Sequence, residues 1–70
     1  MSRLPAAARK VQLLDTAAAV FAQRGYNGTT TAELAKAAGV SEPIIYRHFK
    51  SKKNLFFELV DRTGDETLAN

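Results

Sequence analysis

A cluster of hydrogen-bond donors lies beside a basic run in this 70-residue chain. Tyr46, Arg47 and His48 are consecutive, and the basic run from Arg47 to Lys53 contains no acidic residue. Hydroxyl, guanidinium, imidazole and ammonium groups can all donate hydrogen bonds, so the combination suits phosphate oxygens. The whole chain has a net charge of +3, but charge alone does not distinguish a phosphate-binding surface from an ordinary solvated one.

The composition gives little support to enzyme chemistry or metal binding. The chain has no cysteine and a single histidine, His48, which has no second metal ligand at helical spacing. No paired carboxylates are expected to point inward, and a chain this short has no room for a substantial pocket. We therefore expect no catalytic residue, no metal site and no cofactor. The absence of cysteine excludes disulfides and fits a reducing compartment.

The first element expected to support these donors is a helix over residues 9–24. Gly25 follows it and can end the helix in a left-handed conformation, with Tyr26 folding back onto Phe21. Residues 1–8, which are rich in alanine, are expected to form a flexible lead-in. The apolar stripe of this helix consists of Leu13, Ala17, Val20 and Phe21.

A second, short helix is indicated by a reciprocal cap. Thr30 is followed three residues later by Glu33, the spacing of a capping box. Gly39 ends the helix, and Ser41 can cap a third helix over about residues 42–49. Pro43 falls in the first turn of that helix, where its missing N–H costs nothing.

Ser51 predicts the start of a fourth helix that ends at about Thr63. Asn54 stands where a Glu or Gln would complete a capping box, so we expect a weaker cap here. Residues 64–70 are expected to be a frayed tail. The apolar face of this helix consists of Leu55, Phe56, Leu59 and Val60.

The sequence therefore predicts an all-α fold, a three-helix, homeodomain-like helix-turn-helix spanning residues 9–63 together with its fourth helix. The tight turn at residues 39–41 sets the second and third helices at a steep angle, and the third projects its N-terminal end outward. This geometry allows a recognition helix to enter the major groove of double-stranded DNA. Backbone N–H groups at Thr31 and Ala32 begin the second helix, where a phosphate is favoured.

The segment from Leu13 to Leu59 resembles the DNA-binding domain of the TetR (tetracycline repressor) family of bacterial transcriptional regulators. The spacings together form a strong signal, although any one of them would be weak. The matching elements are Leu13-Leu14 with Ala17, Phe21-x-x-x-Gly25-Tyr26, Thr30-Thr31 with Leu34-Ala35, Ala38-Gly39-Val40-Ser41, Tyr46-x-His48-Phe49, and Lys52.

The resemblance implies two sets of DNA contacts. Backbone phosphates would be contacted by Thr30, Thr31, Tyr46, His48 and Lys52. Bases would be read at the start of the third helix by Glu42, Pro43 and Ile44.

Glu42 could accept a hydrogen bond from a cytosine amino group, whereas Pro43 and Ile44 could pack on a thymine methyl. Because Ala32 and Ile44 are apolar where some relatives are polar or basic, specificity is expected to rely on methyl contacts and DNA shape.

Other roles remain open for some of these residues. Glu42 could do no more than favour the N-terminus of its helix. Tyr46 could serve only in packing, and Lys52 could be an ordinary surface lysine.

The resemblance also implies parts of a regulator that lie outside this sequence. A C-terminal domain would form a homodimer and bind a small-molecule inducer, making the full-length protein a ligand-responsive repressor. The cytoplasm is the expected location, without membrane contact, because the N-terminus has no apolar run suited to a signal peptide and no segment is long enough to span a bilayer. The competing interpretation is a small helical protein-interaction module. That module would use the fourth-helix face that bears Phe57 and Val60.

Overall fold

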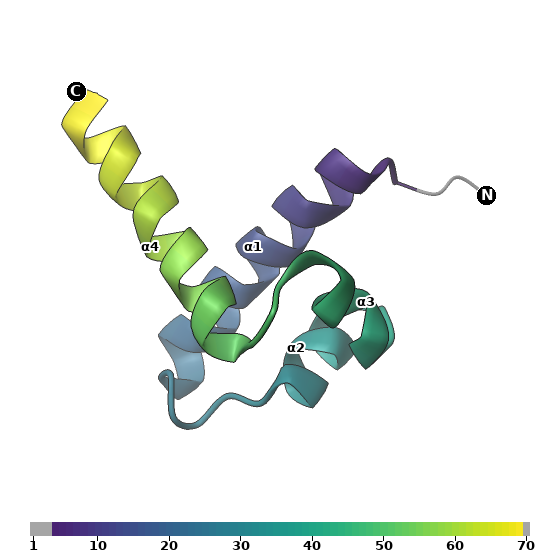
Figure 1. Cartoon of the computed structure of the whole chain (residues 1–70). Helices are drawn as coiled ribbons and strands as arrows, with labels where there is room; N and C mark the ends of the chain where they lie inside the picture. The colour runs from purple at the N-terminus through teal and green to yellow at the C-terminus, as the bar shows by residue number, and fades with distance from the viewer. Residues whose placement is uncertain (1–3, 70) are drawn as a thin grey trace.

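The computed structural model describes residues 4–69, and the side chains of residues 4–62, as four helices. The helices are α1 (Ala6–Arg24), α2 (Thr31–Ala38), α3 (Glu42–His48) and α4 (Lys52–Ala69). No strand is found within residues 4–69, which confirms the all-α prediction. The long helices α1 and α4 diverge toward the two termini, and the short helices α2 and α3 lie together on one side of α1 (Figure 1).

The helix α1 begins at Ala6, three residues before the predicted start at Arg9. Pro5 is its N-cap residue, and the Pro5 carbonyl accepts the Arg9 N–H at 2.8 Å. The prediction underestimated the helix propensity of the three alanines that follow, since alanine has the highest helix propensity of any residue. The expected lead-in of residues 1–8 therefore has a helical end, and residues 1–3 lie outside the described part of the chain.

The helix α4 continues to Ala69, beyond the predicted end at Thr63. Gly64 was expected to open a frayed tail, but its backbone is helical. A glycine inside a helix costs about 1 kcal/mol, and the residues after it include the helix formers Glu, Leu and Ala. The helical backbone thus covers most of the predicted tail, and only Asn70 lies outside the described residues.

Two connections between helices each require a glycine, for different structural reasons. Gly39 adopts the left-handed conformation expected after α2, with φ 74° and ψ 30°. Gly28 lies so close to the end of α1 that a Cβ atom there would come within 2.4 Å of the Arg24 carbonyl oxygen. The α1–α2 connection therefore has no room for a side chain at Gly28.

The helix caps follow the sequence signals with two differences. Thr30 and Glu33 form the predicted capping box of α2. Ser41 occupies the N-cap position of α3, but its side chain makes no capping hydrogen bond. At α4, Ser51 Oγ accepts the Asn54 N–H at 3.0 Å, and Asn54 Oδ1 accepts the Lys50 N–H at 3.0 Å. Asn54 thus completes a reciprocal cap, displaced by one residue from the usual capping box.

One hydrophobic core joins all four helices. It is extended by an aromatic cluster in which Tyr26 stacks on Phe21 with ring centroids 5.8 Å apart, as predicted. Phe56 meets both rings nearly edge-on. The buried apolar residues are Leu13, Leu14, Ala17, Phe21, Leu34, Ala35, Ile45, Phe49, Leu55 and Leu59.

Within the described part of the chain, no helix is both long and apolar enough to cross a membrane.

Candidate nucleic-acid interface

Three of the predicted site residues meet where the start of α2 faces α3. The Thr31 hydroxyl donates to Glu42 Oε2 at 2.6 Å. The Thr31 hydroxyl oxygen also lies 3.0 Å from the Tyr46 hydroxyl oxygen. Thr31 is 9% exposed, whereas Tyr46 is 50% exposed. The side chains of Thr31, Glu42 and Tyr46, here termed the polar cluster, therefore join the two helices of the helix-turn-helix.

Thr30 lies beside the polar cluster and is exposed, but its polar groups already have partners. Its Oγ1 accepts the Glu33 N–H at 3.1 Å, and its own N–H donates to Glu33 Oε1 at 3.1 Å. Glu33 Oε2 also forms an ion pair with Arg24 at 2.7 Å. The first turn of α2 is thereby fixed at its surface, and the N–H groups of Thr31 and Ala32 belong to those without an intrahelical acceptor.

Lys52 makes contacts that the sequence did not indicate. Its ammonium donates to the carbonyl oxygens of Tyr26 at 2.8 Å and Thr29 at 3.0 Å, and it lies 4.1 Å from the Tyr26 ring centroid. Thr29, whose side chain is fully buried, donates its hydroxyl to the Gly25 carbonyl at 2.8 Å. Lys52 thus holds the α1–α2 connection against the start of α4, and one of its three N–H groups remains for another acceptor.

The predicted base-reading residues differ in their surroundings. Pro43 is exposed, whereas Glu42 is half-buried and bonded to Thr31. Ile44 is also half-buried and packs against the core, so less of its side chain is available for contact with a base. A helix at the predicted position is confirmed: α3 ends at His48, with Phe49 as its C-cap residue.

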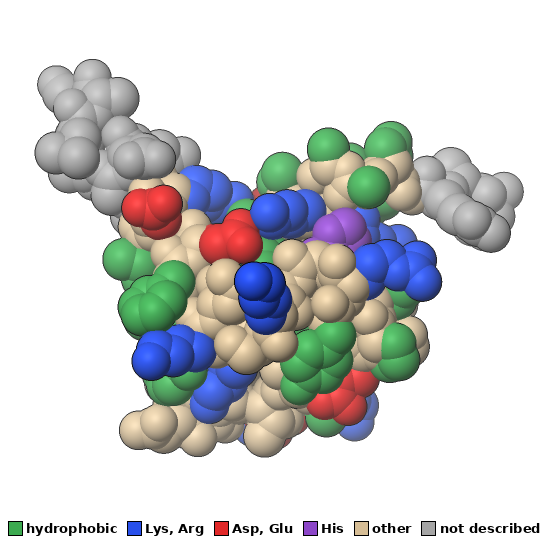
Figure 2. Space-filling view, viewed as in Figure 1, with side chains coloured by type: hydrophobic (Ala, Val, Ile, Leu, Met, Phe, Trp, Pro, Cys, Tyr) green, Lys and Arg blue, Asp and Glu red, His purple; other side chains and the backbone are tan. Residues whose placement is uncertain are grey.

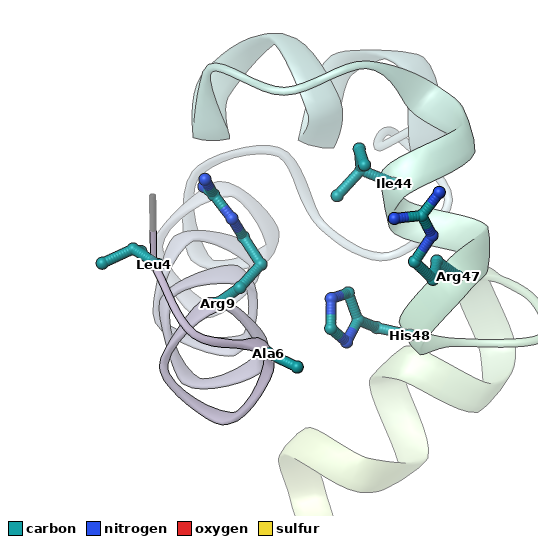
Figure 3. A pocket seen from close by; sticks show the side chains of 6 residues that line it. All are labelled: Leu4, Ala6, Arg9, Ile44, Arg47 and His48. Atoms are coloured by element: carbon teal, nitrogen blue, oxygen red, sulfur yellow. The ribbon is translucent and has the colours of Figure 1, made fainter. Parts of the chain in front are cut away.

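A cleft of about 350 Å³ separates the C-terminal half of α3 from the start of α1. Ile44, Arg47 and His48 line it from α3, opposite Leu4, Ala6 and Arg9 (Figure 3). Arg9 also donates to Gln12 at 2.7 Å, and Gln12 donates to the Ala38 carbonyl at 3.0 Å. His48 therefore lies beside two arginines, and the polar cluster lies on a different part of α3.

Arg9 was not singled out from the sequence, and Arg47 was grouped with the hydrogen-bond donors but not assigned a DNA contact. Arg47 belongs to the basic run, but the family motif selects its neighbours Tyr46 and His48 instead. Arg9 approaches α3 only through the crossing of α1, which no local pattern indicates. Figure 2 shows basic side chains spread over the face that includes α3 and the start of α4.

Comparison with known proteins identifies the family of this chain. Residues 13–59 match the model of bacterial regulatory proteins of the tetR family. The chain belongs to the TetR family. The matched residues cover α2 and α3 and the adjoining parts of α1 and α4.

Several HTH-type transcriptional regulators are similar to much of this chain. The transcriptional activator FasR of Mycolicibacterium smegmatis is 41% identical over 97% of this chain and 31% of its own length. The transcriptional repressor KstR2 of Rhodococcus jostii is 42% identical over 74% of this chain and 26% of its own length. The chain thus spans about a third or less of these relatives.

A solved structure agrees with the fold. A Mesorhizobium loti protein described as a TetR-family transcriptional regulator superposes with a TM-score of 0.83 and 34% sequence identity. The superposition covers 91% of this chain and 32% of the other. The helix-turn-helix fold predicted from the sequence is therefore confirmed.

Proposed function

We propose that this chain is the DNA-binding domain of a TetR-family transcriptional regulator and that α3 enters the major groove of double-stranded DNA. The main support for this proposal is the position of the polar cluster. It brings the start of α2, with its open backbone N–H groups, beside the exposed ring of Tyr46 on α3. A phosphate-binding helix start and a reading helix then share one surface.

The proposed phosphate contacts come from both sides of α3. On the α2 side, Thr30 and Thr31 contribute through the start of their helix, and Tyr46 contributes from α3 itself. On the other side, His48 faces the cleft with two arginines, whose charge supports an anion there. Lys52 contributes its remaining N–H and also holds the connection that leads to Thr30.

Base reading is proposed for Glu42, Pro43 and Ile44, with unequal shares. Pro43 is exposed and can contact a thymine methyl directly. Glu42 presents a carboxylate that can accept from a cytosine amino group. Ile44 is half-buried, so we assign it a smaller methyl contact.

For the full-length regulator, we propose a ligand-responsive repressor that acts as a homodimer on an operator. The inducer site and the main dimer contacts would lie in a C-terminal domain outside this chain, and the protein would act in the cytoplasm without catalysing a reaction. Phe57 and Val60 on α4 are 57% and 50% exposed. We propose that they contact that second domain and not an unrelated protein partner.

The proposed function predicts salt-dependent binding to duplex DNA. In a fluorescence-anisotropy titration against a random-sequence duplex of about two helical turns, affinity should fall steeply between two salt concentrations. Neutralising roughly four to six phosphates gives a log–log slope of roughly −3.6 to −5.4. Unchanged affinity at higher salt, or no binding at low salt, would contradict the proposal.

A further inference from the structure

The polar cluster fixes the direction of its hydrogen bonds. A carboxylate only accepts, so the single Thr31 proton is given to Glu42 Oε2 at 2.6 Å. The Tyr46 hydroxyl, 3.0 Å from the same Thr31 oxygen, must therefore donate to it. The protons run in one direction, from Tyr46 through Thr31 to Glu42.

This direction limits what each hydroxyl can offer to DNA. Phosphate oxygens accept hydrogen bonds, but the Thr31 proton is already used within the protein. The exposed Tyr46 hydroxyl can donate to a phosphate only by exchanging its bond to Thr31. Thr31 is also 9% exposed, which leaves its side chain little access to a phosphate. A phosphate contact at Thr31 thus belongs to its backbone N–H, and its side chain has another role.

Glu42 is the residue that this side chain controls. One carboxylate oxygen, Oε2, is held by Thr31, whereas Oε1 accepts no hydrogen bond from the part of the chain that the structure describes. A tethered carboxylate loses less conformational freedom when it binds than a free side chain does. Oε1 is therefore an acceptor whose position is set before any contact is made.

We infer that Thr31 is a specificity-determining positioning residue, which orients Glu42 so that Oε1 accepts a hydrogen bond from a cytosine amino group. The inference rests on the proposed DNA-binding function. The Thr31 side chain is thereby assigned to the control of base preference and not to a phosphate contact. Tyr46 supports the same orientation by donating to the Thr31 hydroxyl.

The test is selection of sequences from a pool of randomised DNA duplexes by the 70-residue chain and its variants. Wild type should enrich a cytosine at one position. Glu42→Gln should lower the preference for that cytosine about fivefold. Thr31→Val, which keeps the side-chain shape but removes the hydroxyl, should lower it by a similar factor.

Three further comparisons separate positioning from other effects. Thr31→Ser retains the hydroxyl and should restore the cytosine preference. The double variant Thr31→Val/Glu42→Gln should lose no more preference than Glu42→Gln alone, because both changes act through one carboxylate. The salt slope should be the same for Thr31→Val as for wild type, since no phosphate contact is removed.

Different results would overturn the inference in distinguishable ways. Thr31→Val with unchanged base preference and a shallower salt slope would return its hydroxyl to the phosphate contacts. Loss of preference in Glu42→Gln alone would show that Glu42 needs no positioning. If folded wild type, checked by circular dichroism, binds no duplex in the pool, then the proposed function itself fails and this inference with it.

Discussion

Tyr46 and Lys52 were both predicted to contact phosphate, yet the structure places them in opposite situations. Tyr46 is 50% exposed and has one internal hydrogen-bond partner, Thr31. The Lys52 ammonium binds two backbone carbonyls and lies over the Tyr26 ring. Both donors therefore have internal partners, but Tyr46 keeps its ring at the surface, whereas Lys52 holds the α1–α2 connection against the start of α4.

The difference divides the molecule into two regions. The polar cluster forms a surface whose groups can face DNA. The α1–α2 connection and the start of α4, here termed the braced connection, are held by internal hydrogen bonds and the aromatic cluster. Changes in the braced connection should reduce stability first, whereas changes in the polar cluster should alter DNA binding first.

Among the substitutions considered, the largest loss of stability is expected at Lys52. Lys52→Ala removes two charge-assisted hydrogen bonds from carbonyls of the braced connection, and we expect a loss of about 2–3 kcal/mol in unfolding free energy. Thermal denaturation followed by circular dichroism measures it, with exposed Lys53→Ala as the matched control. A melting temperature equal to that of the control would make Lys52 an ordinary surface lysine and remove the contrast with Tyr46.

The next effect tests the close approach at Gly28. The added Cβ atom of Gly28→Ala would lie 2.4 Å from the Arg24 carbonyl oxygen, so backbone must move. We expect a loss of about 1–3 kcal/mol in urea denaturation, typical of an overpacked site. Asn27→Ala, an exposed neighbour in the same turn, should change stability much less. Equal midpoints for the two variants would mean that the braced connection is loosely held.

A smaller effect distinguishes two N-caps that look alike in sequence. Thr30→Ala removes a side-chain cap and should cost about 1 kcal/mol. Ser41→Ala removes a side chain that makes no capping bond, so its cost should be only a few tenths of that. Chemical denaturation of both variants measures the difference, and the reverse order would contradict the cap geometry.

The smallest effect is expected for the ion pair that joins α1 to α4 at the surface. Asp15 lies 3.1 Å from Arg62, and the Asp15 side chain is 65% exposed. Asp15→Asn should change the unfolding free energy by less than about 0.5 kcal/mol, since solvent screens such pairs. A loss above 1 kcal/mol in the same assay would show that the outer α1–α4 contact supports the fold as strongly as the braced connection does.

Local signals predicted much of the fold. The Thr30–Glu33 capping box and the Gly39 stop depend on residues only a few positions apart, and both appear as expected. The helix ends at Ala6 and Ala69 were missed because adding a turn at a helix end changes the free energy little. Single residues there carry too weak a signal to fix a boundary.

The site was predicted less completely, because its contacts join residues far apart in sequence. Lys52 binds carbonyls that precede it by 23 and 26 residues. Glu42 follows its partner Thr31 by 11 residues. Side chains of these types suit phosphate or bases, but their internal partners exist only after the helices pack. Motif reading therefore identified Thr31, Glu42 and Tyr46 without indicating that they contact one another.

The most direct test of DNA binding through α2 and α3 is an NMR titration of the ¹⁵N-labelled chain with duplex DNA. Binding through these helices should give amide shifts concentrated at Thr31, Ala32, Glu42 and residues 44–48, with Phe57 and Val60 unaffected; Pro43 has no amide proton. Shifts confined to the Phe57–Val60 face of α4, or no shifts at all at low salt, would contradict it.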